Sequence, residues 1–504
     1  MTMHDGIVTV LWNGQTLRVP RGTRLSDAIR AESPCGGHGR CGKCRVIASG
    51  ALSPVTDAER RHLSAEELAR GVRLACIATV EGDAVVTRLS EEHTQILSDG
   101  IDVKHGKSAL FSRYGAAIDV GTTTLAAKLF RADGSEIAAC SRLNPQSAFG
   151  ADVISRIEAA LRGEGSALAT VIREALCGML SALAKDAGIG TDEIERVVIT
   201  GNTAMLYFFT ETSPYPLSRA PFKANRLFGE TLSAESAGLS CLSPETPVVL
   251  PPCISAFVGA DTVCALLAAD MPRTGKTLLL TDIGTNGEMA LSCGEDLFVC
   301  STAAGPAFEG VGISMGMRGA DGAIDAVTVI NGALHAHTIG GKAPIGICGS
   351  GLVDAVACLL DVEELDETGL LEDDAAVIGA PVVLTQKDVR AVQLAKSAIC
   401  AGMETLFCHR GISVRQIDAF YLAGGFGSYL HLGNAERIGL IPEGLAPRAE
   451  VIGNAALSGA AMLLFDAEAF MRCVGIQKRA QVVDLATNKT FADKFMNGML
   501  FSGG

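Results

Sequence analysis

Aromatic residues and long apolar runs are both scarce in this 504-residue chain. One tryptophan and five tyrosines leave few platforms on which bases or sugars could stack. A membrane span needs roughly 18 or more apolar residues, and no run here approaches that. The nearest, residues 251–269, contains Asp261 and is predicted to form a buried core helix. The first residues lack the basic and apolar regions of a secretion signal, so we expect a cytoplasmic protein without a membrane partner.

Positive charge is also in short supply, because the formal net charge is −14. A nucleic-acid-binding protein needs a basic face, so we expect no nucleic-acid partner. Sixteen cysteines could indicate disulfides, but without a secretion signal most are expected to be reduced and buried. The hydrophobic fraction of 48% is enough for large cores, and the length suggests about three domains.

Four cysteines near the start of the chain are expected to bind a metal cluster and not to be buried free thiols. Their spacing is C-x5-C-x2-C, followed by 31 residues before the fourth. This spacing fits neither two-cluster ferredoxins nor zinc ribbons, and it suits a loop around a [2Fe–2S] cluster, with zinc as the alternative. His38 lies in the loop and is interpreted as solvent-facing, since a Rieske site needs two histidines. The predicted metal ligands are Cys35, Cys41, Cys44 and Cys76.

The surroundings of these cysteines predict a small domain of the β-grasp ferredoxin type. Two alternating segments flank Asn13 and Gly14, a pair that favours a β-hairpin turn. Helices are expected over residues 25–31 and 56–69, and strands after Cys44 and from residue 84. The predicted organisation is a ferredoxin domain at 1–92, a linker at 93–113 that would let it move, and a larger domain at 114–504.

A motif of the form D-x-G-T occurs twice, each time between two predicted strands. The copies begin at Asp119 and Asp282, 163 residues apart, which indicates an internal duplication. Such a carboxylate can hold Mg²⁺ through water, glycine lets the backbone approach a phosphate, and hydroxyls bind its oxygens. The alternative is ordinary hydrogen bonding within a hairpin. The candidate phosphate-binding residues are Gly121, Thr122, Thr123, Thr124, Gly284, Thr285, Asn286 and Gly287.

Two glycine-rich turns extend the candidate site. The turn with Gly424, Gly425 and Gly427 follows a predicted strand and could lie against an adenosine. The second, Gly349, Ser350 and Gly351, could either face the nucleotide or cap the helix that follows. Strands alternate with helices around these turns, which predicts an α/β fold of two lobes, about 114–275 and 276–480.

With these motifs the chain resembles the ASKHA superfamily (acetate and sugar kinases, Hsp70, actin), in which two ribonuclease-H-like lobes hold ATP. It is more specifically similar to the reductive activators of corrinoid proteins, which add a [2Fe–2S] ferredoxin domain. The matching stretches are 198–205, 258–261, 300–310, 347–354 and the turn at Gly424. The resemblance implies an ATP-dependent, one-electron reduction of a corrinoid protein from Co(II) to Co(I), in support of a methyltransferase. Mg²⁺ would bind near Asp119 and Asp282, which are the implied catalytic carboxylates.

The resemblance also implies partners, and it leaves alternatives open. We expect a corrinoid methyl-carrier protein, an upstream electron donor such as a ferredoxin, flavodoxin or reductase, and a homodimer. A small-molecule kinase would have no use for the cysteine loop. An activator of 2-hydroxyacyl-CoA dehydratases would share one [4Fe–4S] cluster between two subunits. A redox-sensing nucleotide switch without enzymatic activity is the third alternative.

Overall fold

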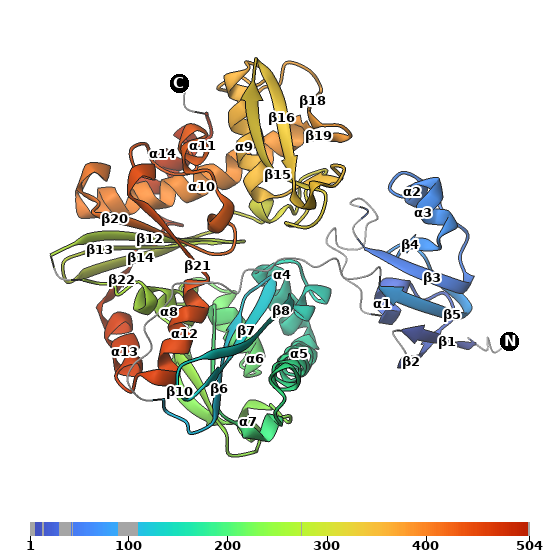
Figure 1. Cartoon of the computed structure of the whole chain (residues 1–504), viewed down its shortest axis with the longest axis horizontal. Coiled ribbons are helices and arrows are strands. Elements are labelled where there is room, and N and C mark those ends of the chain that lie inside the picture. The colour runs from blue at the N-terminus through green and yellow to red at the C-terminus, as the bar shows by residue number, and fades with distance from the viewer. Residues whose placement is uncertain are drawn as a thin grey trace. The chain divides into compact units, whose positions relative to one another are not determined.

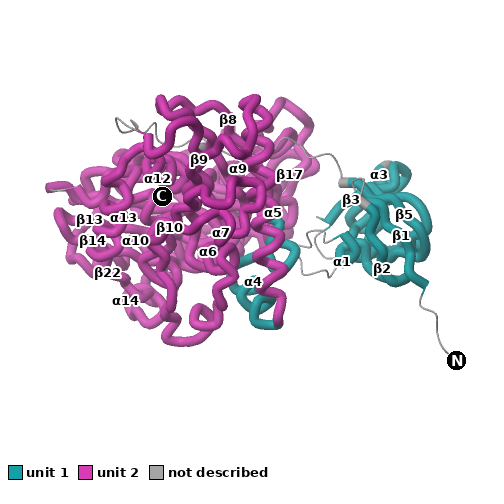
Figure 2. Tube along the Cα trace, turned by 90° about the horizontal axis from the view of Figure 1, so that it is seen from below, with its two compact units in different colours: residues 1–93, 145–162 teal, residues 94–144, 163–504 magenta. Residues whose placement is uncertain are grey.

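The protein is described here as a computed structural model, with residues 6–12, 15–29, 42, 44–88, 109–273 and 275–501 placed. The chain forms two compact units (Figure 2). The first consists of residues 1–93 with 145–162, and the second of residues 94–144 with 163–504.

A five-stranded sheet with strand order β2-β1-β5-β3-β4 organises the first unit (Figure 1). β1 and β5 run parallel at its centre, and β1 pairs with β2 in the register Trp12 to Gln15, as the hairpin prediction requires. The predicted helix at 56–69 is instead two short helices. The elements are β1 Ile7–Trp12, β2 Gln15–Pro20, α1 Leu25–Ile29, β3 Arg45–Leu52, α2 Asp57–Arg60, α3 Ala65–Ala69, β4 Val72–Leu74 and β5 Val80–Arg88.

A buried ion pair ties helix α2 to strand β4. The guanidinium of Arg73 donates two hydrogen bonds to the Glu59 carboxylate, at 2.8 and 3.1 Å, and the side chain of Glu59 is completely buried. The same carboxylate accepts from the backbone N–H of Leu74 at 3.2 Å and caps α2 through Thr56. Burial alone would raise the pKa of Glu59, but Arg73 and the backbone donors outweigh it and lower that pKa. This pair holds the strand that leads directly to Cys76.

Replacing Arg73 by leucine is expected to destabilise the first unit by about 3–5 kcal/mol, because a buried carboxylate loses its counter-ion. Thermal unfolding of the full chain, followed through the visible absorbance of the loaded cluster, measures the loss. Arg21→Leu is the matched control, since its pair with Glu81 is exposed and its removal should leave the midpoint nearly unchanged. A midpoint for Arg73→Leu equal to that of the control would show that the buried pair is dispensable.

Residues 145–164 form short helical segments. Asp152 caps α4 through the backbone N–H of Ser155 at 2.8 Å, and Gly163 adopts a φ of 103° where the helix is interrupted. The segments are η1 Pro145–Ala148, α4 Val153–Ala159 and the π turn η2 Ala160–Glu164.

The second unit contains two six-stranded sheets that repeat one plan (Figure 1). In each, three consecutive strands form an antiparallel meander, and a later strand lies parallel beside the first of the three. This repetition confirms the internal duplication and the two-lobed α/β fold. The first sheet, ordered β10-β11-β9-β6-β7-β8, consists of β6 Tyr114–Val120, β7 Thr124–Arg131, β8 Glu136–Leu143, β9 Ile194–Gly201, β10 Phe228–Ser233 and β11 Pro247–Pro252.

The second sheet has the order β21-β20-β12-β13-β14-β22. Its strands are β12 Thr277–Ile283, β13 Gly287–Cys293, β14 Asp296–Thr302, β20 Ala419–Ala423, β21 Ala449–Gly453 and β22 Ala480–Val482. A smaller insertion contains β15 Ala323–Ile330, β16 Ala333–Thr338, β17 Gly346–Ile347, β18 Ala375–Gly379 and β19 Val382–Thr385.

Helices cover both sheets. The first lobe contains α5 Gly165–Ala187, α6 Thr203–Phe209, α7 Ala234–Ala237 and α8 Ala260–Ala268. The second half of the chain supplies α9 Gly349–Asp361, α10 Gln386–Arg410, α11 Leu432–Arg437, α12 Ala455–Phe465, α13 Ala469–Arg479 and α14 Lys489–Asn497. Helices α5 and α10 end at Gly188 and Gly411, which both adopt left-handed caps with φ of 70° and 71°.

The expectation for one apolar segment is wrong. Residues 251–269 do not form one helix: β11 ends at Pro252 and α8 begins only at Ala260. One helical segment, Val153–Ala187, is long and apolar enough to cross a membrane by length and composition, and half of its most apolar window is buried in the structure. Core helices pass the same test, so this is weak evidence for a span.

The two lobes are joined through helices α8 and α12. Gly459 of α12 lies so close to α8 that an added Cβ would be 1.9 Å from the carbonyl oxygen of Cys264. Helix α12 comes from the second half of the sequence, yet it packs on strands β6 and β9 of the first lobe. The start of α12 is thereby carried to the ends of the first-lobe strands.

Candidate nucleotide cleft and cluster-binding loop

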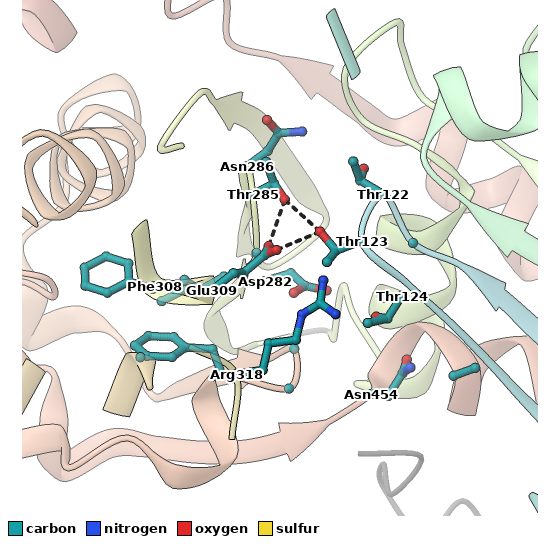
Figure 3. A pocket seen from close by; sticks show the side chains of 18 of the residues that line it. Thr122, Thr123, Thr124, Asp282, Thr285, Asn286, Phe308, Glu309, Arg318 and Asn454 are labelled. Carbon is teal, nitrogen blue, oxygen red and sulfur yellow. Dashed lines mark hydrogen bonds between the residues drawn. The ribbon is translucent and has the colours of Figure 1, made fainter. Parts of the chain in front are cut away.

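A cavity of about 320 Å³ lies where the two D-x-G-T turns face each other (Figure 3). The β6–β7 turn supplies one wall and the β12–β13 turn the opposite one. The starts of α6, α8, α9 and α12, the turn after β20 and residues 308–309 and 317–319 also contribute to the lining. Of the predicted residues, it includes Asp119, Gly121, Thr122, Thr123, Thr124, Asp282, Gly284, Thr285, Asn286, Gly349, Ser350, Gly424 and Gly425.

The two predicted carboxylates occupy equivalent places at the ends of β6 and β12. Burial raises the pKa of Asp119 to about 7, with the charge of Asp261 adding to the effect. A hydrogen bond of 3.0 Å from the side-chain amide of Asn454 acts in the opposite direction. Burial likewise raises the pKa of Asp282 to about 7, and the charges of Asp261 and Glu309 contribute.

Further acids line the same cavity, and the sequence analysis assigned them no role. Burial raises the pKa of Asp261, at the start of α8, and raises that of Glu288 well above its usual range. Crowded carboxylates of this kind favour a cation between them. Within the described ranges, no three acidic, histidine or cysteine side chains converge into a ready-made metal cage. Carboxylate oxygens are ligands that suit Mg²⁺, which keeps several water ligands and takes others from phosphates.

Glu309 links the two D-x-G-T turns. Its carboxylate accepts hydrogen bonds from the hydroxyl of Thr123 at 2.6 Å and from that of Thr285 at 2.8 Å (Figure 3). The two hydroxyl oxygens lie 3.4 Å apart. A carboxylate thus occupies hydroxyl donors that were predicted to bind phosphate oxygens. A phosphate group bound by these two hydroxyls would have to compete with Glu309 for both donors.

Replacing Glu309 by glutamine is expected to tighten the binding of Mg²⁺-free ADP several-fold, roughly five- to tenfold, because one negative charge leaves the phosphate site. Titration calorimetry with ADP in the presence of a chelator measures the change. Glu295→Gln, at an exposed turn of the same lobe, is the matched control. Weaker binding in Glu309→Gln would mean that the nucleotide does not displace the carboxylate from the threonines.

The remaining polar contacts hold the first turn in shape. The side-chain amide of Asn202 donates to the hydroxyl of Thr122 at 3.0 Å, and Asn202 also caps α6. Asn144 donates to the carbonyl of Gly121 at 2.8 Å. Both asparagines are far from the motif in sequence, so the motif alone did not indicate them.

The glycines of the candidate site divide into two groups. Gly424 has a φ of 89°, and an added Cβ would lie 2.5 Å from the Asp282 carboxylate. At Gly349 an added Cβ would lie 2.0 Å from the carbonyl oxygen of Phe308. By contrast, Gly287, Gly351 and Gly427 are not among the lining residues. Close packing against protein atoms accounts for the missing side chains in both groups, with Ile324 beside Gly351 and Leu422 beside Gly427.

Aromatic and cationic side chains at the cavity were not predicted. The rings of Phe308 and Phe426 stack with centroids 5.1 Å apart, and Tyr429 lines the cavity while more than half exposed. Arg318 points into the same space (Figure 3). An arginine opposite crowded acids can bind phosphate, and exposed rings can stack on a base. In the sequence, the glycine-rich run at 424–427 was the signal for this part of the cavity.

Two of the four predicted cluster ligands can be placed. The sulfur atoms of Cys44 and Cys76 lie 3.2 Å apart, and both side chains are buried. The separation exceeds the roughly 2.05 Å of a disulfide bond, so two buried thiols face each other. Gly42 beside them has a φ of 63°, as expected for a tight loop. Cys35, Cys41 and His38 lie outside the described residues, as does the greater part of the predicted linker.

Two ribonuclease-H-like lobes around an acidic, threonine-lined cleft define the ASKHA class of nucleotide-binding proteins, here joined to a ferredoxin-type unit. Models of known families match along the chain. A 2Fe-2S iron-sulfur cluster binding domain matches residues 8–81, the RACo middle region residues 114–274, and the C-terminal ASKHA domain of RACo residues 276–503.

Whole proteins match as well. Corrinoid activation enzyme RamQ of Eubacterium limosum is 37% identical over 77% of this chain and 70% of the relative. The [Co(II) methylated amine-specific corrinoid protein] reductase of Methanosarcina barkeri is 27% identical over 76% of each chain. A solved reductive activator for corrinoid,iron-sulfur protein is 26% identical, covers 98% of both chains and superposes with a TM-score of 0.71. The chain belongs to the family of reductive activators of corrinoid proteins.

Proposed function

We propose that this protein reduces a corrinoid protein from inactive Co(II) to Co(I) and that ATP hydrolysis drives the transfer. The observation that carries the proposal is the presence in one chain of the buried Cys44 and Cys76 thiols and of a cleft with paired acid–threonine turns. A phosphotransferase has no use for the former, and a simple electron carrier has no use for the latter. The named functions of the relatives support the same reading.

An energetic gap explains why two such units would be combined. When bound, a plant-type [2Fe–2S] cluster supplies one electron at a potential near roughly −400 mV. Each Co(II) takes up one electron to become Co(I), and a reductant outside the chain replaces it. A gap on the order of 100 mV corresponds to about 2 kcal/mol for one electron. Converting ATP and water to ADP and phosphate can cover that amount through a change in conformation.

Within the cleft, we assign ATP and Mg²⁺ to the residues that face it. Asp119 and Asp282 would hold Mg²⁺ through water and orient the attacking water. The hydroxyls of the two turns would bind phosphate oxygens once Glu309 yields them. The Gly424–Gly425 turn would lie against the adenosine. Some of these groups belong to the first lobe and the others to the second. A bound nucleotide would therefore favour the arrangement in which the two lobes contact it together.

The partners follow from the same proposal. The acceptor is a corrinoid methyl-carrier protein, and the donor is a ferredoxin, a flavodoxin or a reductase. We further propose a homodimer in solution, which sedimentation of the full chain would test.

The decisive experiment uses the full, cluster-loaded and chemically reduced protein. It is mixed with a methylated amine-specific corrinoid protein in the Co(II) state, with and without Mg-ATP, while the Co(I) absorption band is recorded. A corrinoid iron–sulfur protein serves as a second acceptor. Co(I) that forms only with Mg-ATP is the expected result. Failure with both acceptors, despite an intact cluster and measurable ATPase activity, would contradict the proposal and favour the redox-sensing switch.

A further inference from the structure

Three of the four exposed aromatic side chains in the described part of the chain belong to two loops of the first lobe: Tyr215 and Phe222 lie between α6 and β10, and Phe257 lies between β11 and α8. Tyr215, Phe222 and Phe257, here called the aromatic patch, are 57%, 41% and 43% exposed. The rings of Phe222 and Phe257 lie 5.7 Å apart, and the guanidinium of Arg219 lies 6.0 Å from the centre of the Tyr215 ring. The fourth, Tyr429, lines the cleft. In a chain so poor in aromatics, such a concentration in water marks a contact surface.

The loop that carries Tyr215 and Phe222 is firmly anchored. It connects α6 to β10, and at its base the buried Tyr207 hydroxyl donates to Asn225 at 2.8 Å and accepts from the backbone N–H of Arg226 at 2.9 Å. Phe222 has a φ of 52°, a left-handed conformation that bulky residues rarely adopt. Strained backbone that displays an aromatic ring to solvent is found where a ligand or partner binds.

The charge around the patch indicates the chemistry of the partner. Arg219 and Lys223 are exposed beside the rings, although the whole chain has a net charge of −14. Neither forms an ion pair with a carboxylate among the described residues. A two-fold symmetric dimer formed through this patch would place Arg219 and Lys223 of both copies in one interface, four cations in all. The surface therefore fits a different protein with an acidic and partly apolar face.

The patch is mechanically connected to the nucleotide cleft. Phe257 belongs to a turn in which the Ser255 hydroxyl accepts from the backbone N–H groups of residues 257 and 258, at 3.3 and 3.1 Å. The Ser255 carbonyl accepts from the Thr203 hydroxyl at 2.7 Å. Thr203 follows Asn202, whose amide holds Thr122 in the phosphate-binding turn.

The other end of the same turn also reaches the cleft. Gly259 packs so tightly that an added Cβ would lie 2.4 Å from the Cα of Asn202. Two residues later comes Asp261, one of the cavity acids. Both ends of the segment that carries Phe257 therefore contact Asn202 of the cleft or its neighbour Thr203, which gives a contiguous path from the cleft to the ring.

We propose that the aromatic patch is the docking surface for the corrinoid protein, and that the nucleotide in the cleft adjusts its affinity through residues 253–261. This inference rests on the proposed function, and it adds the site and the chemistry of the partner. The partner would present carboxylates to Arg219 and Lys223 and apolar side chains to the rings. Its affinity would differ between the ADP-bound and ATP-bound states.

The test measures binding of a Co(II) methylated amine-specific corrinoid protein to the full, cluster-loaded protein by calorimetry. Phe222→Ser is expected to weaken binding about tenfold or more. The double variant Arg219→Glu and Lys223→Glu is expected to weaken binding and to flatten its salt dependence. Met471→Ser and Lys478→Glu, both exposed on α13, are the matched controls and should bind as wild type. ATPase activity without the partner should be unchanged in all four variants.

Nucleotide dependence is the second readout. Wild-type affinity is expected to differ several-fold between Mg-ADP and a non-hydrolysable ATP analogue, and Phe222→Ser should reduce that difference. Wild-type binding by both patch variants, with Co(I) still formed, would overturn the docking surface and leave the proposed function standing. Altered sedimentation with unchanged partner binding would assign the patch to contacts between copies and overturn it too. If wild type neither binds nor reduces this acceptor or a corrinoid iron–sulfur protein, the proposed function itself fails.

Discussion

Asp119→Asn and Asp282→Asn are each expected to slow ATP hydrolysis by about a hundredfold to a thousandfold. Each substitution keeps the shape of the side chain but removes the charge that would hold Mg²⁺ and orient water at the end of β6 or β12. Phosphate release by the full protein at saturating Mg-ATP measures the effect. Asp373→Asn, which is exposed and remote from the cleft, is the matched control. Hydrolysis within a few-fold of wild type in either variant would remove that carboxylate from the catalytic assignment.

The same variants are expected to be more stable than wild type when no nucleotide is present. Burial and neighbouring acids raise the pKa values of Asp119 and Asp282 to about 7, so their ionised forms destabilise the empty cleft. Removing one charge at about pH 8 should raise the unfolding temperature by about 2–4 °C. Activity and stability would then change in opposite directions, which a merely structural role for these residues does not predict.

The dependence on pH follows from the same groups. An acid whose pKa is higher in the folded than in the unfolded state binds protons more tightly when folded. Stability without nucleotide should therefore fall as the pH rises from the ordinary aspartate pKa of 3.8 through about 7. If Asp119 and Asp282 bind Mg²⁺, Mg-nucleotide needs their ionised forms, and its stabilising effect should be larger at about pH 8 than at about pH 6. Thermal unfolding with and without Mg-ADP at the two pH values measures both trends. A larger effect at the lower pH would contradict the sign.

Local patterns were sufficient to predict the fold and the centre of the cleft. The D-x-G-T turns and the hairpin signal at Asn13 and Gly14 each depend on residues that are neighbours in sequence. The lining of the cleft by Asp119, Asp282 and the threonines agrees with those patterns. The roles assigned to them remain predictions.

The other side of the cleft depends on contacts between distant residues. Glu309 reaches Thr123 across 186 positions, and Asn454 reaches Asp119 across 335. No local pattern contains such a pair. Gly351 and Gly427 were predicted to bind the nucleotide but do not line the cavity. Glycine allows both close approach to a ligand and close packing of protein atoms, and the sequence does not distinguish the two. The exposure of Phe222 could not be predicted from local sequence either, because it depends on the contacts by which Tyr207 holds the loop.

Replacing Cys44 by alanine is expected to abolish Co(I) formation while ATP hydrolysis continues. Its sulfur lies 3.2 Å from that of Cys76 in the core of the first unit, whereas all cleft residues belong to the second. Losing one of four thiolate ligands should leave the purified protein with little or none of the iron and sulfide of one cluster per chain. Iron, sulfide and ATPase assays on the same preparation separate the two losses. Cys473→Ala, another buried thiol, is the matched control and should retain the cluster. Full iron content in Cys44→Ala would place the cluster on other residues, and loss of ATPase activity as well would mean that hydrolysis depends on the cluster-bearing unit.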